Sequence, residues 1–123
     1  TEINNVVEKL KDGTGVKYVN TNSTGADSVA SGTDSTAVGV AANATGGNSL
    51  ALGAGAAAGQ AGAVALGAGS STAAAVATTG AIINGTAYTY AGSAPVSTVS
   101  VGSAGNERTV TNVAAGRVSS TST

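Results

Sequence analysis

The chain contains no cysteine, histidine, methionine, tryptophan or phenylalanine, and it has a single proline. Without cysteine there can be no disulfide bonds and no thiolate metal sites. Without histidine the chain lacks the usual general base near neutral pH and the commonest metal ligand. These absences exclude most classes of enzyme, and no catalytic constellation can be assembled from the remaining residues. We therefore expect no enzymatic activity, no cofactor and no bound metal.

Charge is also scarce, because the 123 residues include only five basic and six acidic side chains, for a net charge of −1. This balance provides no basic surface for nucleic acid or for anionic lipid. No apolar run approaches the roughly 18 residues that a membrane-spanning helix needs. We expect neither nucleic acid nor a membrane to be a partner of this segment.

Large apolar side chains are the third shortage. Hydrophobic residues make up 41% of the chain, but 26 of them are alanine, and only 15 valines, 4 leucines, 3 isoleucines and 3 tyrosines accompany them. Leucine, isoleucine and valine together fall below the roughly 20% at which folding as a globular domain becomes doubtful. The low charge nevertheless argues against disorder. Contacts with other copies of the chain are the simplest way to supply the missing apolar surface.

A short phrase recurs between residues 26 and 71, as DSVASG at 27–32, DSTAVG at 34–39, NSLALG at 48–53 and GAVALG at 62–67. Its closing glycines Gly39, Gly53 and Gly67 are 14 residues apart, and Gly32 precedes Gly39 by half that period. Repetition at a fixed spacing predicts a solenoid. The three glycines are expected at tight corners, where positive φ angles are needed.

Alternation within the phrase predicts strands whose faces are both apolar. Stacking one period on the next predicts three ladders, namely Thr36–Leu50–Val64, Ala37–Ala51–Ala65 and Val38–Leu52–Leu66. We expect Leu50, Leu52, Val64 and Leu66 to be buried against the opposite wall of the coil, and the alanine face to approach another copy. Asp34 and Asn48 are expected to stack as a polar corner.

The first residues, TEINNVVEKLK, place Ile3, Val6 or Val7, and Leu10 at heptad-like spacing. This pattern indicates the end of a coiled-coil helix, which is too short to be stable without neighbouring copies or more upstream chain. A frayed tail is the alternative interpretation. Asp12–Gly13 is expected to end the helix, and residues 15–19 alternate as in a strand.

The 14-residue register breaks after residue 71, since the next similar phrase, STVSVG, ends at Gly102, 35 residues after Gly67. Within this insertion, Asn84–Gly85 separates two β-prone runs and predicts a hairpin. Tyr88 and Tyr90 would share one strand face, followed by a loop at Pro95. These tyrosines either cover a thin core or contact a ligand.

Four segments together resemble one known family. The repeats NSLALGAGAAAGQAGAVALGAGS resemble the YadA-like head repeat of trimeric autotransporter adhesins, which are Gram-negative surface fibres, and SVGSAGNERTVTNVAAGRVS resembles their neck motif. TTGAIINGTAYTYAGSAPVSTVSVG is similar to the head-insert motif, and DGTGVKYVNTNSTGADSVASG is similar to the entry from coiled coil to head. The resemblance covers nearly the whole chain.

The resemblance implies an all-β fold, a trimeric left-handed parallel β-roll (a β-solenoid) with an inserted hairpin and a neck, preceded by a short coiled-coil helix. It implies the following division: 1–12, the end of a coiled-coil stalk; 13–25, a connector; 26–71, the head repeats; 72–99, the head insert; and 100–123, a neck leading to a downstream stalk.

The resemblance also implies a function, as part of a homotrimeric adhesin that attaches a bacterium to host cells, extracellular matrix or other bacteria, and so contributes to biofilm formation, autoaggregation and virulence. The segment would lie outside the cell on an outer-membrane-anchored fibre. Export and anchoring would belong to other parts of a longer protein. The characteristic neck positions are Asn106, Glu107, Arg108, Asn112 and Gly116, and Glu107 is expected to pair with Arg108 between chains.

The receptor is not identified by the sequence, and the candidate ligand-binding residues are Asn48, Ser49, Tyr88 and Tyr90. Collagen binding in one branch of the family is attributed to many copies of N-S-V-A-I-G-x-x-S. Only residues 48–53 come close to that phrase here, and Ala56 replaces its final serine.

Other classes of repetitive protein fit less well. An ice-binding solenoid needs a regular threonine ladder, which Thr36–Leu50–Val64 interrupts, and a silk-like or elastin-like linker would not end in the charged, non-repetitive GNERTVTNVAAGR. The remaining alternative is a structural fibre segment, like part of a phage fibre or a spacer head, with no ligand of its own.

Overall fold

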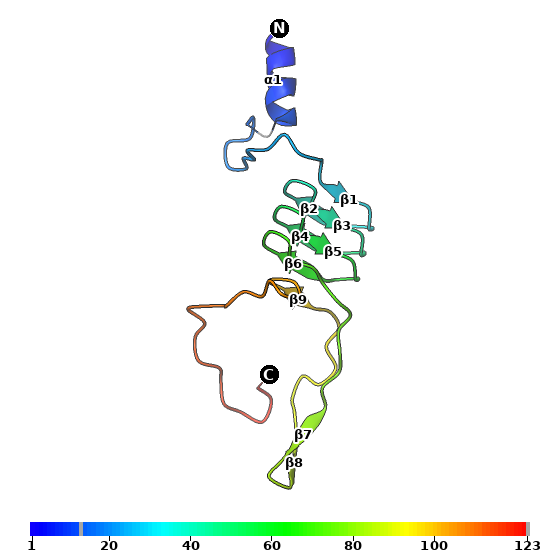
Figure 1. Ribbon diagram of the computed structural model, residues 1–123, viewed down its shortest axis with the longest axis vertical. Coiled ribbons are helices and arrows are strands. Elements are labelled where there is room, and N and C mark those ends of the chain that lie inside the picture. The colour runs from blue at the N-terminus through cyan, green and yellow to red at the C-terminus, as the bar shows by residue number, and fades with distance from the viewer. Residues whose placement is uncertain (13, 123) are drawn as a thin grey trace.

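The computed structural model describes residues 1–12 and 14–122, and this part of the chain is mostly β-structure with one short helix. Figure 1 shows an elongated molecule in which the helix, a stack of strands and a hairpin follow one another along the long axis. The elements are α1 (Glu2–Lys11), β1 (Val29–Ala30), β2 (Thr36–Val38), β3 (Asn43–Ala44), β4 (Leu50–Leu52), β5 (Ala57–Ala58), β6 (Val64–Leu66), β7 (Gly80–Ile83), β8 (Thr86–Thr89) and β9 (Val99–Ser100). The expected all-β class is confirmed.

The predicted N-terminal helix is present as α1. Thr1 caps it, because its hydroxyl accepts a hydrogen bond from the Asn4 amide at 3.1 Å. None of its residues is buried, so its apolar positions have no partner among the described residues. Asp12 is the C-cap, and the proposed break at Asp12–Gly13 extends to Gly13, which lies outside the described residues. No helix in the described part of the chain is long and apolar enough to span a bilayer.

The strand expected at residues 15–19 is wrong. Val16 and Val19 form only an isolated antiparallel bridge, with Lys17 and Tyr18 in the turn between them. Alternation alone was not sufficient here, because no other strand of the described residues lies beside this segment to complete a ladder.

Residues 26–71 form successive coils that alternate between two parallel sheets. The strand orders are β1-β3-β5 and β2-β4-β6-β9, so that from β1 to β6 each strand pairs with the one two positions along the chain. The registers join Thr36 to Leu50 and Leu50 to Val64, and likewise for the other two predicted ladders. The 14-residue stacking predicted from the repeat is therefore confirmed.

The interior of the coils is lined by alanine. In the part of the chain that the structure describes, the fully buried hydrophobic residues are all alanines, and the main cluster consists of Ala42, Ala44, Ala51, Ala56, Ala58 and Ala65. The two walls of the coil lie so close that methyl groups fill the space between them. The prediction that the leucine face is buried inside the coil is wrong, because Leu50 and Val64 are half-buried and Leu52 and Leu66 are exposed on its outside. The expected roles of the two faces are reversed.

The predicted corners are confirmed in their backbone geometry. Gly39, Gly53 and Gly67 have φ angles of +127°, +131° and +108°. A Cβ atom on Gly53 would lie 2.6 Å from the carbonyl carbon of Gly67, so successive coils approach too closely for any side chain. Asp34 and Asn48 occupy equivalent left-handed positions at the other corner, with φ of 56° and 55°.

The insertion contains the predicted hairpin, in which β7 pairs with β8 in antiparallel register. Asn84 and Gly85 form its turn with φ of 49° and 79°, the left-handed pair that a two-residue hairpin requires. Within the described residues, β7 and β8 contact no other strand or helix, and the hairpin projects beyond the coils (Figure 1). The expectation that Tyr88 and Tyr90 cover a thin core is therefore wrong for the single chain. After the insertion, β9 returns to pair with β6, joining Val99 to Val64.

Candidate interaction surfaces

The outer face of the sheet β2-β4-β6-β9 is an apolar surface. Two ladders run along it, Thr36–Leu50–Val64–Val99 and Val38–Leu52–Leu66. Leu52 and Leu66 remain 38% and 43% exposed, although each has neighbours above or below in its ladder. We call these seven residues the leucine face. A continuous apolar surface of this kind on an otherwise small-residue coil marks an interaction site.

The outer face of the sheet β1-β3-β5 has a different composition. Its ladder consists of Val29, Asn43 and Ala57, and an isolated bridge continues it to Ser71. Small and polar side chains predominate here, and no leucine is present. The two walls of the coil therefore differ in polarity, and only one offers a broad apolar surface.

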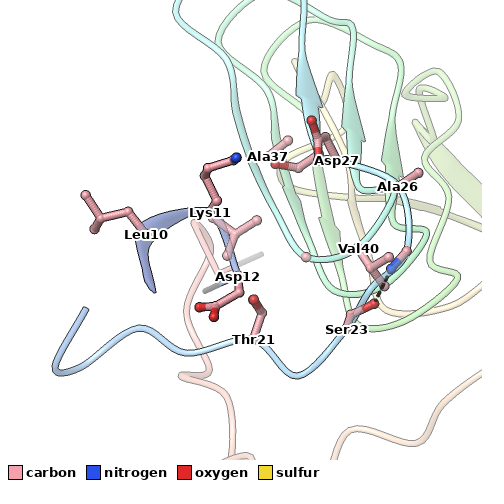
Figure 2. Close-up of a pocket in the computed structure, with 13 residues that line it drawn as sticks. Leu10, Lys11, Asp12, Thr21, Ser23, Ala26, Asp27, Ala37 and Val40 are labelled. Atoms are coloured by element: carbon pink, nitrogen blue, oxygen red, sulfur yellow. Dashed lines mark hydrogen bonds between the residues drawn. The ribbon is translucent and has the colours of Figure 1, made fainter. Parts of the chain in front are cut away.

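A hollow of about 450 Å³ lies where the helix meets the first coil. Figure 2 shows Leu10, Lys11 and Asp12 on its helix side, and Asp27, Ala37 and Val40 on its coil side. The hydroxyl and amide of Thr14 donate to the Asp12 carboxylate, at 2.6 and 2.9 Å, and hold the pKa of Asp12 below its ordinary value. No cluster of three metal-ligating side chains occurs within the described ranges.

Asn48 and Ser49 are adjacent in sequence, but the structure places them on opposite sides of the corner. Asn48 is exposed, with its backbone in the left-handed region. Ser49 is only 2% exposed, and its hydroxyl contacts the carbonyl oxygens of Gly46 and Ala58 at 2.6 and 3.3 Å. Ser49 therefore satisfies buried backbone groups and is not available to a ligand.

Tyr88 and Tyr90 are accessible on the projecting hairpin, with exposed fractions of 52% and 42%. Ile82 and Ile83 on the partner strand are exposed as well. By register Ile83 lies on the same face of the hairpin as Tyr88, and Ile82 lies on the opposite face. Asn48 and the tyrosines do not form one site.

The expected neck residues lie beyond β9. Residues 103–106 form a tight turn closed by the Asn106 amide, which donates to the Ser103 carbonyl at 2.8 Å. The Gly105 amide donates to Glu107 at 2.9 Å, and this bond together with Glu107's own amide lowers the pKa of that carboxyl. Asn112 has a left-handed backbone with φ of 59°, and Gly116 has open space around it.

Within the chain, Arg108 contacts backbone carbonyls and a serine hydroxyl, and it does not contact Glu107. Its guanidinium donates to the carbonyl oxygens of Ala68 and Val101 at 2.6 and 2.7 Å, and to the Ser70 hydroxyl at 3.1 Å. The only ion pair among the described residues joins Lys11 to Glu8. Sequence reasoning did not identify Ser70, although a signal exists, because the equivalent positions in the two preceding coils are Ala42 and Ala56.

Comparison with known proteins identifies the repeats. The family described as the YadA head domain repeat matches twice, over residues 30–56 and 44–70. The autotransporter adhesin BtaE of Brucella suis biovar 1 (strain 1330) is 66% identical over 41 residues, which are 33% of this chain and 6% of that protein. The C-terminal YadA-like domain of BPSL2063 from Burkholderia pseudomallei is 44% identical with a TM-score of 0.67, over 95% of this chain and 48% of that one. The chain thus spans less than half of the length of either relative.

Proposed function

Because the chain carries the head repeats of a trimeric autotransporter adhesin, we infer that it is part of a homotrimeric fibre in which the leucine face of each copy packs against the others. The observation that carries this inference is the reversal of the two faces. Alanine fills the inside of the coil, so the large apolar side chains are left outside, where only another molecule can cover them.

The difference between the two walls supports one orientation of the copies. Packing the leucine faces together around a common axis would bury Leu52 and Leu66 and leave the polar wall, with Asn43, facing water. The scarcity of large apolar side chains also favours a trimer, since a chain with so few of them gains stability from a buried interface.

The flanking segments fit the same assembly. Ile3, Val6, Val7 and Leu10 on α1 are exposed in the single chain, and three helices could bury them in a coiled coil. We propose that residues 1–12 end a stalk, 13–25 connect it to the head, 72–99 form a head insert and 100–123 form a neck. The head repeats would form a left-handed parallel β-roll.

The proposed role of the fibre is adhesion at the bacterial cell surface, outside the outer membrane. Its targets would be host cells, extracellular matrix or other bacteria, and it would act by broad surface contact with no catalytic step. From Ser35 to Asn106 the chain has no charged side chain. Adhesion through the head would therefore depend on apolar and hydrogen-bonding contacts, and it would weaken little as salt concentration rises.

A spacer role is the second candidate, and the same uncharged, small-residue surface favours it, since such a surface offers few anchors of the kind that dominate interfaces. Binding of the purified trimer to matrix proteins and to cultured cells tests the two. Saturable binding that survives high salt supports adhesion by this head. A trimer that binds none of these surfaces supports the spacer.

A further inference from the structure

A series of hydrogen bonds at one corner links each coil to the next. The carbonyl oxygens of Ala26, Val40 and Ala54 accept from the amides of Ala41, Gly55 and Gly69, at 2.9, 2.8 and 2.8 Å. Ala68 is the next residue in this series. Among the described residues no backbone amide donates to its carbonyl, which accepts instead from Nη2 of Arg108 at 2.6 Å.

The atoms that lie beside the corner glycines change in the same way from coil to coil. A Cβ atom on Gly39 would lie 2.7 Å from the carbonyl carbon of Gly53, and one on Gly53 would lie 2.6 Å from that of Gly67. A Cβ atom on Gly67 would lie 3.2 Å from Cζ of Arg108. The guanidinium therefore lies over Gly67 where the backbone of another coil would otherwise be.

The Ser70 hydroxyl also takes the place of a backbone amide donor. The carbonyls of Val38 and Leu52 accept from the amides of Gly53 and Gly67 in the next coil, at 2.8 and 2.7 Å. The equivalent carbonyl of Leu66 accepts from the Ser70 hydroxyl at 2.8 Å, and Ser70 in turn accepts from Nη1 of Arg108. The same Nη1 donates to the Val101 carbonyl at 2.7 Å, on the far side of the insertion.

We propose that Arg108 is the end cap of the coil, a side chain that takes the place of the next turn of backbone and joins the two ends of the insertion. A planar guanidinium suits this role, because it can lie flat against a glycine while its fixed N–H groups donate in several directions. A cap is needed because β9 pairs with β6 only through Val99 and Ser100, and the backbone groups left unpaired beyond this pairing invite fraying and pairing with other strands. All of these contacts lie within one chain.

The test compares Arg108→Lys with Ser70→Ala, using Arg117→Lys as the matched control because Arg117 makes none of these contacts. Amide hydrogen exchange would be followed by NMR on the purified chain at the Gly67, Gly69, Gly55 and Ala41 amides. Lysine keeps the charge but cannot reproduce the planar set of donors, so exchange at Gly67 and Gly69 should accelerate about tenfold or more, as expected for losing bonds to a charged group.

Exchange at Gly55 and Ala41, in the earlier coils, should remain that of the parent, and so should all four amides in Arg117→Lys. Ser70→Ala restores the residue found at positions 42 and 56, so it should fold and show a smaller acceleration confined to the last coil. Unchanged exchange at Gly69 in Arg108→Lys would overturn the proposal. Uniform acceleration at all four amides, with loss of the trimer in sedimentation, would also overturn it, because Arg108 would then act between chains.

Discussion

Replacing both exposed leucines of the leucine face, Leu52→Asn with Leu66→Asn, should weaken assembly of the trimer. Asparagine is close to leucine in size, so the change removes apolar surface while largely preserving shape. The side chains point away from the alanine-lined interior, and the coil itself should tolerate them. The effect should therefore be on contacts between copies.

The magnitude follows from the fraction of each leucine that only another copy can cover. Complete burial of a leucine is worth about 1.5–3 kcal/mol, and 38% and 43% of these two remain exposed, so their loss costs about 4–7 kcal/mol per trimer. That energy corresponds to roughly 10³- to 10⁵-fold in the association constant of three chains. Because the midpoint concentration of a trimer varies with the square root of this constant, it should rise about 30- to 300-fold.

Sedimentation equilibrium across a range of concentrations measures this midpoint, and circular dichroism on the same samples reports the β-structure. Ala57→Asn is the matched control, because Ala57 lies on the polar wall in register with Asn43, which already carries that side chain. The control should assemble like the parent. A double variant with the midpoint of the parent, or a control shifted as far as the double variant, would refute the assignment of the leucine face as the interface.

Three further outcomes are expected. Ala51→Leu should destabilise the coil by about 1–3 kcal/mol or more in thermal unfolding, because Ala51 is fully buried between the two walls, whereas Ala57→Leu on the outside should not. Gly85→Val should disrupt the hairpin turn, at a cost of about 1–2 kcal/mol for a branched residue at φ of 79°, and NMR contacts between β7 and β8 should vanish while those of the coils persist. The lowered pKa of Glu107 means that its contribution to stability is present above its ordinary value of 4.5 and is lost as pH falls through the lower folded value, so the Gly105 amide resonance should titrate below pH 4.5 in the parent and not in Glu107→Gln.

The charged pair of the neck illustrates a limit of reasoning from motif and charge. Glu107 and Arg108 are adjacent opposite charges in a nearly uncharged region, and this pattern favoured a pair between chains. Within one chain the structure gives each of them a backbone partner, Gly105 for Glu107 and Ala68 for Arg108. Sequence identified the right residues without identifying their contacts. The pair between chains stays a prediction.

The sequence by itself determined the period and the register of the ladders, through the repeat, and the position of the hairpin, through Asn84–Gly85. These features depend on local rules, namely that stacked coils superpose residues one period apart and that Asn84–Gly85 tolerates the left-handed turn. The direction of the two faces could not be determined in this way. Alternation of Leu50, Ala51 and Leu52 is the same whichever face points inward, and only the spacing between the two walls, which admits methyl groups, decided that alanine lies inside.

The role of Arg108 also depended on the tertiary structure. Its partners Ser70 and Ala68 precede it by 38 and 40 residues, with the whole insertion between them, and no spacing rule joins a side chain to a backbone carbonyl at that distance. The contact exists because β9 returns to the coil beside β6 and brings the following segment to the corner that holds Ala68 and Ser70. Only the return of the chain to β6 placed the guanidinium beside Gly67, where the backbone of a further coil would have been.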